Sequence, residues 1–226
     1  MKKTVAIIIM LIMFMVQLYP VAVAAELFPD LIVQLFDAKG KPLKDNRTGE
    51  YIYGTHWAVK DIMKSTQIGL IVGYNTNGEY VFKPDQPITR AEFIKMAMVL
   101  STNRTFDFDT IPSSISHWAG KYVKVAEMQN VIEKDKYTDK NLDEPITRIE
   151  MICILSRIQI NMKSIEQNRE GKLQYTDIGN LTEEEKALLL HAAKYTLIND
   201  MLETTTFMPN QNLTRAEATV AIMRIY

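Results

Sequence analysis

Ile88-Thr-Arg-Ala-Glu-Phe93 is the stretch that decides the fold, because the chain carries it three times. It returns as Ile146-Thr-Arg-Ile-Glu-Met151 and again as Leu213-Thr-Arg-Ala-Glu-Ala218. After each copy, apolar residues recur at i, i+4 and i+7, which is the spacing of one apolar stripe on a helix. The sequence therefore predicts three helices that begin at the same signal, and it indicates an internal repeat.

The Thr and the Glu of the motif are predicted to cap these helices. A Thr at the N-cap and a Glu three residues later form a capping box, which satisfies backbone N–H groups that a helix start leaves free. The six capping residues are Thr89, Glu92, Thr147, Glu150, Thr214 and Glu217. Capping explains the Thr and the Glu, but it gives no role to the Arg between them.

The Arg of the motif points to an anionic ligand. A cation in the first turn faces the positive end of the helix dipole, which is unfavourable by about 0.3–1 kcal/mol. Arg90, Arg148 and Arg215 nevertheless occupy this position in all three copies. We therefore interpret the three arginines as unexplained by folding and as candidates for holding something anionic.

A second helical pattern precedes each motif. Its starts are His56-Trp57-Ala58, His117-Trp118-Ala119 and Glu183-Glu184-Glu185. Each unit is thus a helix, a polar loop and a Thr-Arg helix. Two short helices bury little apolar surface alone, so the three units are predicted to share one core. In the first loop, Asn77-Gly78 predicts a tight turn.

The N-terminal residues 1–25 have the pattern of a secretory signal peptide. Two lysines precede an apolar run over 5–16, and Ala-Val-Ala at 22–24 resembles a cleavage site. The alternative is an uncleaved membrane anchor, which needs about 20 apolar residues, and Pro20 interrupts the run. Without this segment, 24 basic and 27 acidic residues remain, a net charge of −3. Such a protein has no general attraction for nucleic acid, so any anion must be held locally.

Residue types that carry catalysis or bind metals show no telling arrangement. The single Cys153 cannot form an internal disulfide and is expected to be buried apolar filler. The three histidines and this cysteine lack the spacing of zinc ligands. No pair of carboxylates, nucleophile elbow or phosphate loop stands out. We expect no enzyme, no cofactor and no metal site.

The order of the motifs resembles the S-layer homology (SLH) repeat of bacterial surface proteins. In the first copy, His-Trp is followed by Gly69-Leu-Ile-x-Gly-Tyr74, by Asn-Gly, by Phe-x-Pro and by the Thr-Arg-Ala-Glu motif. Phe28-Pro-Asp30 and Tyr175-Thr-Asp177 also resemble the Phe-x-Asp that opens such repeats. The resemblance covers three tandem repeats and implies a mainly α, pseudo-threefold spindle with grooves between its prongs.

The resemblance also sets the expected domain boundaries. After the signal peptide, repeat one spans 26–101 with an insertion at 31–53, repeat two spans 102–160, a linker spans 161–174 and repeat three spans 175–226. Within the insertion, the apolar run from Leu31 to Phe36 and the turn-rich 37–41 predict a small β-hairpin.

For function, the resemblance implies a secreted protein held non-covalently at the bacterial cell wall or S-layer. The ligand would be a secondary cell-wall polysaccharide, often pyruvylated, with Arg90, Arg148 and Arg215 in the grooves. A guanidinium binds a carboxylate through two parallel hydrogen bonds, and helix N-termini favour the same anion.

Four further residues are secondary candidates for binding this polymer. The indoles of Trp57 and Trp118 can stack on a sugar ring, and packing in the core is the equal alternative. Asn77 and Gly78 can let the backbone approach a ligand, although turn formation alone would explain them.

The repeats differ, and other functions stay open. Repeat three has Glu183-Glu184 in place of His-Trp, and repeat two lacks Asn-Gly and Phe-x-Pro. We therefore predict unequal grooves, of which at most two bind well. The alternative functions are a surface adaptor that recruits another protein, through the 31–53 insertion or a free face, and a wall-active hydrolase.

Overall fold

The computed structural model describes residues 27–102, 106–195, 197–198 and 205–226. The chain divides into two compact units, 1–84 and 85–226, called unit one and unit two below. The predicted signal peptide, 1–25, lies outside the described residues. Among the helices of the described part, none is both long and apolar enough to cross a membrane.

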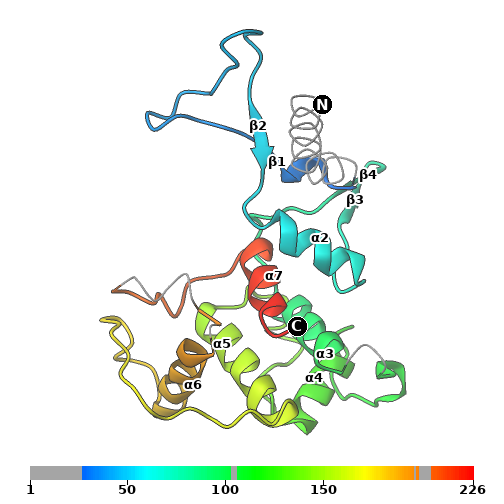
Figure 1. Cartoon of the computed structure of the whole chain (residues 1–226). Coiled ribbons are helices and arrows are strands. Elements are labelled where there is room, and N and C mark those ends of the chain that lie inside the picture. The colour runs from blue at the N-terminus through cyan, green and yellow to red at the C-terminus, as the bar shows by residue number, and fades with distance from the viewer. Residues whose placement is uncertain (1–26, 103–105, 196, 199–204) are drawn as a thin grey trace, which may run out of the picture. The chain divides into compact units, whose positions relative to one another are not determined.

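Within its described residues, unit one contains the helix α2 and two antiparallel hairpins (Figure 1). Its elements are η1 (Pro29–Leu31), β1 (Ile32–Gln34), β2 (Tyr53–Thr55), α2 (Val59–Gln67), β3 (Tyr74–Thr76) and β4 (Glu79–Val81). β1 pairs with β2 and β3 pairs with β4. Phe28, Leu31, Ile62 and Phe82 are buried and form the apolar centre of the unit. The predicted hairpin near the N-terminus is present as a β-bridge between Phe36 and Pro42, on either side of the turn at 37–41. The strand β1 itself pairs with β2.

Residues 35–52 form an arm between β1 and β2. The backbone N–H of Leu35 donates to the carbonyl of Ile52, that of Ile52 to Leu43, and that of Leu43 to Leu35, which closes a triangle of hydrogen bonds. Beyond this triangle lie two turns, in which the carboxylates of Asp37 and Asp45 accept backbone N–H groups. The insertion is therefore an ordered arm, and local side-chain caps shape its turns.

The Asn77-Gly78 turn joins β3 to β4. Asn77 has φ 56° and Gly78 has φ 92°, and positive φ at both central residues is what a type I′ hairpin turn requires. The predicted tight turn is confirmed. The flanking strands were predicted only as loop, because three-residue strands of mostly polar residues are too short to show a period of two.

A carboxylate clip occurs in each unit at the Phe-x-Asp sequences. Asp30 accepts the backbone N–H groups of Phe82 and Lys83 at 2.9 and 2.5 Å. Asp177 accepts those of Phe207 and Met208 at 2.8 and 2.7 Å. Burial raises the pKa of Asp177, but the two N–H groups outweigh it and hold this pKa below its ordinary value. Asp30 thus fastens the start of unit one to the loop at 82–83, and Asp177 fastens the residues before α6 to the loop at 207–208. Each loop precedes a Thr-Arg motif.

Unit two is helical. The helices in its described residues are α3 (Arg90–Ser101), α4 (Gly120–Met128), α5 (Arg148–Arg157), α6 (Glu183–Lys194) and α7 (Arg215–Met223), with the 3₁₀ helix η2 (Phe108–Thr110) and the π-helix η3 (Ile158–Met162). α3, α5 and α7 each begin at the motif Arg, as the repeated signal predicted. Together with unit one, this confirms a mainly α fold with small hairpins.

α5 is the central helix of unit two, and it packs against α6 (Figure 1). All of its residues except Glu150 are buried. Cys153 is 3% exposed, and burial raises the pKa of its thiol to about 12. Its burial confirms the expectation that this cysteine fills the core. A thiol with so high a pKa is also a poor nucleophile.

A buried histidine fastens the predicted linker to α6. The ring of His191 is fully buried, and its Nδ1 accepts the backbone N–H of Asn168 at 3.2 Å. The proton of the neutral ring is therefore on Nε2, which donates to Oε1 of Gln159 at 3.1 Å. Protonation of Nδ1 would place two donors face to face, so this arrangement needs the neutral ring.

Unit two should consequently lose stability in mild acid. Burial, assisted by the charge of Lys194, lowers the pKa of His191 below its ordinary value. The unfolded chain then takes up the proton first, so the contribution of His191 is complete above about pH 6.5 and is lost as pH falls from there toward the lower folded pKa. The measurement is the urea midpoint of unfolding at pH 7.5, 6.5 and 5.5. In a His191→Gln variant the fall between these values should shrink, and an unchanged fall would contradict the assignment.

Candidate functional site

The three motif segments are joined to one another in a closed cycle within unit two. The backbone N–H of Ile88 donates to the carbonyl of Leu213, that of Leu213 to Ile146, and that of Ile146 to Ile88, at 3.0, 3.1 and 3.0 Å. Single β-bridges between neighbouring segments follow the same cycle. The three helix starts are therefore held next to one another, although 58 and 67 residues of sequence separate them.

The helix N-termini use their free N–H groups inside this cycle. The N–H groups of Arg90, Arg148 and Arg215 donate to carbonyls of neighbouring segments at 3.0, 2.9 and 2.8 Å. In α3 and α5 the next N–H does the same, and the third is capped by the motif Thr. The expectation that free helix N–H groups help to bind an anion is thus wrong for these two helices, because neighbouring segments already satisfy them.

Each motif Glu has two tasks. In all three copies the Thr side chain accepts the N–H of the Glu, and the Glu carboxylate accepts the N–H of the Thr, which is a complete capping box. The other oxygen of each Glu faces the motif Arg of another copy. Arg90 Nε donates to Glu150 Oε1 at 2.9 Å.

The Arg–Glu pairs close a second cycle. Arg215 Nη1 lies 3.3 Å from Glu92 Oε1, and Arg148 Nη2 lies 3.7 Å from Glu217 Oε1. Each copy thus lends its Glu to the Arg of another copy. The interpretation that folding leaves the arginines unexplained is therefore wrong. Their carboxylate partners lie on another copy of the motif, so the helix-dipole argument, which considers one helix at a time, could not find them.

The three arginines are held unequally. Arg90 has a 15% exposed side chain and also binds the carboxylate of Glu144 at 2.5 Å and the carbonyl of Asn141. Burial alone would lower the pKa of Arg90. The hydrogen bond to Glu144 and the charge of Glu150 outweigh burial, and they hold this pKa above its ordinary value. The Arg90 guanidinium is thus surrounded by two carboxylates, which repel an incoming anion.

Arg148 has the weakest carboxylate partner of the three. Its Nη1 donates to the carbonyl of Phe207 at 2.9 Å, whereas Glu217 stays at 3.7 Å. Its Nε is buried and has no hydrogen-bond partner in the described part of the chain. Arg215, by comparison, is only 3% exposed and pairs with Glu92. A buried donor without a partner is costly, and among the motif arginines this feature is particular to Arg148.

The two tryptophans are exposed at the starts of their helices. Trp57 is 63% and Trp118 is 51% exposed, so the alternative of packing in the core is wrong for both. The neighbouring histidine explains why. Nδ1 of His56 accepts the N–H of Ala58, and Nδ1 of His117 accepts that of Ala119. Each histidine ring is thus tied to the backbone just before its helix, and the indole after it is left exposed.

The predicted site residues are divided between the two units. The cycle in unit two brings the three arginines together, and Trp118 belongs to the same unit. Trp57, Asn77 and Gly78 belong to unit one. Sequence reasoning missed Glu144, Asn141 and Tyr137, whose hydroxyl donates to Glu150 at 3.3 Å. No motif marks these three, since they lie in a loop without regular spacing.

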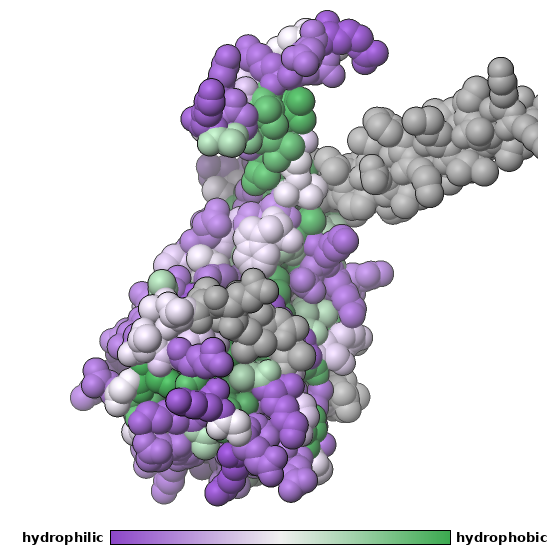
Figure 2. Space-filling view, turned by 60° about the vertical axis from the view of Figure 1, so that its left-hand side comes forward, coloured by the Kyte–Doolittle hydropathy of each residue, from purple (hydrophilic) through white to green (hydrophobic). Residues whose placement is uncertain are grey.

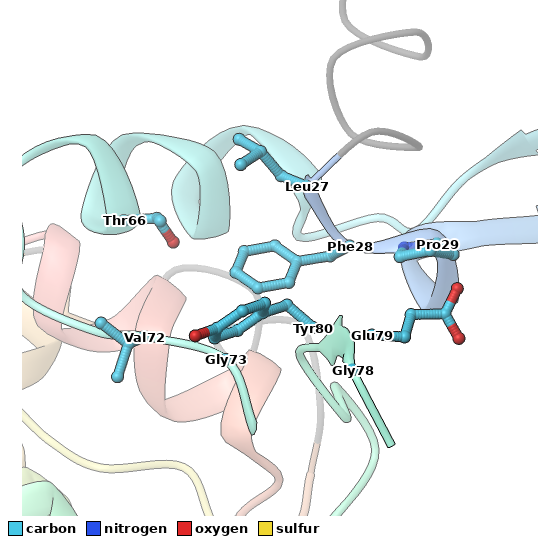
Figure 3. A pocket seen from close by; sticks show the side chains of 9 residues that line it. All are labelled: Leu27, Phe28, Pro29, Thr66, Val72, Gly73, Gly78, Glu79 and Tyr80. Atoms are coloured by element: carbon cyan, nitrogen blue, oxygen red, sulfur yellow. The ribbon is translucent and has the colours of Figure 1, made fainter. Parts of the chain in front are cut away.

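Unit one has a hollow of about 620 Å³ beside the β3–β4 turn (Figure 3). Its lining is Leu27, Phe28, Pro29, Thr66, Val72, Gly73, Gly78, Glu79 and Tyr80. The rings of Phe28 and Tyr80 face this hollow. At Gly73 a Cβ would lie 2.4 Å from the Phe28 ring and 2.8 Å from the Val81 carbonyl, so only glycine fits there. The lining holds no cation, and an anion would find no charge partner in it.

Metal ligands do not gather in the described part of the chain, where no three His, Cys, Asp or Glu side chains are placed to hold an ion. The chemistry that unit two offers is therefore hydrogen bonding and ion pairing by guanidinium groups. Trp118 adds an exposed aromatic face on the same unit.

Comparison with known proteins identifies one domain. Residues 52–94 match the S-layer homology domain family. The chain is also 26% identical over 189 residues to an amylopullulanase of Thermoanaerobacterium thermosulfurigenes. That alignment covers 83% of this chain but 9% of the relative, so the chain spans about a tenth of that protein's length. S-layer homology domains are non-catalytic modules that attach proteins non-covalently to the cell wall, and the match indicates a cell-wall or cell-surface association in bacteria.

Proposed function

We propose that this secreted chain binds an anionic secondary cell-wall polysaccharide through the arginines of its three Thr-Arg-x-Glu motifs. In this proposal the three predicted repeats form a pseudo-threefold spindle, and the polymer lies in the grooves between them. The observation that carries the proposal is the Arg148 guanidinium, which is held in the motif cycle with a distant carboxylate and an unpartnered Nε.

The electrostatics of the cycle favour one arginine over the others. Around Arg90, two carboxylates lie within ion-pair distance of one cation, whereas at Arg148 one carboxylate lies at the longer distance of 3.7 Å. A carboxylate on a ligand can form two parallel hydrogen bonds with a guanidinium. Arg148 is 8% exposed, and such a ligand would need to displace the weakly held Glu217 to reach it. The grooves are then unequal, with Arg148 as the main anion receptor.

A pyruvylated sugar has the chemistry that this arrangement requires. Its ketal carboxylate is compact and permanently charged at neutral pH, and its sugar ring presents an apolar face. The exposed indole of Trp118 offers a surface for that face. Asn77 and Gly78 are explained by the turn that they form, and their contribution to binding would be to place the exposed Tyr80 beside the hollow of unit one.

Sedimentation with purified cell-wall sacculi tests this function. The protein should pellet with intact sacculi and stay in solution when the secondary polymer has been stripped or lacks pyruvate. Because the contact is between charges, the bound fraction should also fall as salt rises. Retained binding to bare peptidoglycan would contradict the mechanism.

A second function is favoured by the arm of unit one. Phe36, Tyr51 and Tyr53 are 55%, 48% and 56% exposed, and Figure 2 shows apolar side chains gathered below the hydrophilic tips of the arm. Exposed apolar clusters on a small unit commonly mark a contact surface. The chain would then also act as an adaptor that recruits a surface protein. Replacing the arm, 35–52, with a short turn between β1 and β2 should release such a partner from sacculi while the chain itself still sediments, and release of both would contradict a separate role.

A further inference from the structure

A polar groove runs along α6 in unit two. It consists of two hollows of about 540 and 310 Å³ that share Gln167 and Arg169 in their linings. The first hollow reaches Glu184 at the start of α6, and the second reaches Lys194 and Tyr195 at its end. These volumes together are in the range of small-ligand sites.

The segment 166–170 lies where the two hollows meet, and it is fastened to α6. Asn168 is buried, its N–H donates to His191, and its side chain binds the carbonyl of Glu170 and Nζ of Lys194. Asn168 is buried, whereas Gln167 is half-buried and Arg169 is exposed. Arg169 Nη2 donates to Gln167 Oε1 at 3.1 Å, so these two side chains line both hollows as a hydrogen-bonded pair.

The floor of the first hollow is a buried guanidinium. Arg157 is 8% exposed, and its Nη2 donates to Glu133 at 2.8 Å and to Glu184 at 2.5 Å. Both of the bonds recorded for Arg157 within the described residues leave from Nη2, so Nε and Nη1 are the donors available to a ligand. Arg157 lies nine residues along α5 from Arg148, which is about 13 Å. The groove is thus a different site from the motif cycle.

The charges of the groove are nearly balanced. The lining cations are Arg157, Arg169 and Lys194, and the lining anions are Glu166, Glu170, Glu183 and Glu184. A groove with no net positive charge does not attract a polyanion. Its amides, carboxylates and guanidinium groups can, however, both donate to and accept from neutral hydroxyl groups. The Tyr195 ring adds an apolar surface.

We propose that this groove binds an uncharged oligosaccharide, separately from the anionic polymer at the motif arginines. The hydroxyl groups of the sugar would bind Arg157, Gln167 and Arg169, and one ring would lie against Tyr195. A chain with both sites could hold a neutral glycan and an acidic polymer of the same wall.

The test is a titration of the full mature chain with N-acetylchitotetraose and maltotetraose as neutral probes, followed by calorimetry or by amide chemical shifts. At least one probe should bind, with shifts at 166–170 and at the start of α6. The double variant Gln167→Ala/Arg169→Ala changes side chains that line both hollows and should bind that probe about five- to tenfold more weakly. Lys172→Ala, an exposed neighbour that lines neither hollow, is the matched control.

The outcomes separate this site from the proposed function. Arg148→Met should leave the neutral probe unaffected, because it is remote from the groove. Failure of both probes to bind, or equal binding by the double variant and the control, would overturn the proposal. Loss of neutral-probe binding in Arg148→Met would also overturn it, since the two sites would then be one.

Discussion

Replacing Glu150 with alanine should lower the free energy of unfolding of unit two by about 2–3 kcal/mol. This carboxylate accepts the N–H and the hydroxyl of Thr147 through one oxygen, and Arg90 and the buried Tyr137 through the other. Loss of this carboxylate uncaps α5, the central helix. It also leaves Arg90 Nε and the hydroxyl of Tyr137 without the acceptor that they share. The side chains of Glu150 and Arg90 are 14% and 15% exposed, so water replaces them only in part.

The chain supplies a matched control in Glu185. Its carboxylate closes the same kind of capping box with Thr182, at 2.8 and 3.0 Å, but on an exposed helix start and with no ion pair recorded in the described residues. Glu185→Ala should therefore cost about 0.5–1 kcal/mol, which is the cap alone. Thermal unfolding followed by circular dichroism measures both variants, with a decrease in Tm of about 5–10 °C expected for Glu150→Ala. Equal decreases would mean that the links between motif copies add nothing to the cap.

The helices of this fold were predictable because their signals are local. Thr and Glu at a fixed spacing predict the starts of α3, α5 and α7, and the apolar stripe that follows each start indicates a helix. The strands were harder, since β3 and β4 are three residues long and show no period. The partner of β1 lies beyond the arm, and no local pattern indicates a pairing between strands that the whole arm, 35–52, separates.

The candidate site was predictable in its residues but not in its connections. Recurrence alone selected Arg90, Arg148 and Arg215, and it also selected the glutamates as caps. The cycle in which the Glu of one copy binds the Arg of another depends on packing between segments 60 to 123 residues apart, which no spacing rule covers. The sequence predicted unequal grooves from Glu183-Glu184 in repeat three and from the loop motifs that repeat two lacks. The structure instead locates a difference at Glu144, a loop residue that adds a second carboxylate beside Arg90.

Arg148→Met should weaken binding of a pyruvylated polymer fragment by at least about tenfold, the largest loss among the three motif arginines. Methionine keeps the length of the apolar stem, so the change removes the charge and the forked donors with little change in packing. Arg90→Met should weaken binding only about two- to threefold, because Glu150 and Glu144 already occupy that guanidinium. Arg215→Met should have the smallest effect, since Arg215 is 3% exposed and pairs with Glu92.

The arginine whose loss weakens binding most, Arg148, should be the one whose loss destabilises unit two least, and that contrast is what identifies a ligand site. Arg90 has the closest carboxylate partners, so its loss should destabilise unit two most, whereas Arg148 has the most distant one. Calorimetry with the fragment, at a temperature where circular dichroism shows every variant folded, measures the affinities. Arg148→Lys separates charge from geometry, because an ammonium keeps the charge but cannot form the paired hydrogen bonds. It should recover part of the affinity that Arg148→Met loses. Equal losses at all three arginines would contradict the inequality, and no loss at Arg148 would show that the unpartnered Nε is a feature of folding alone.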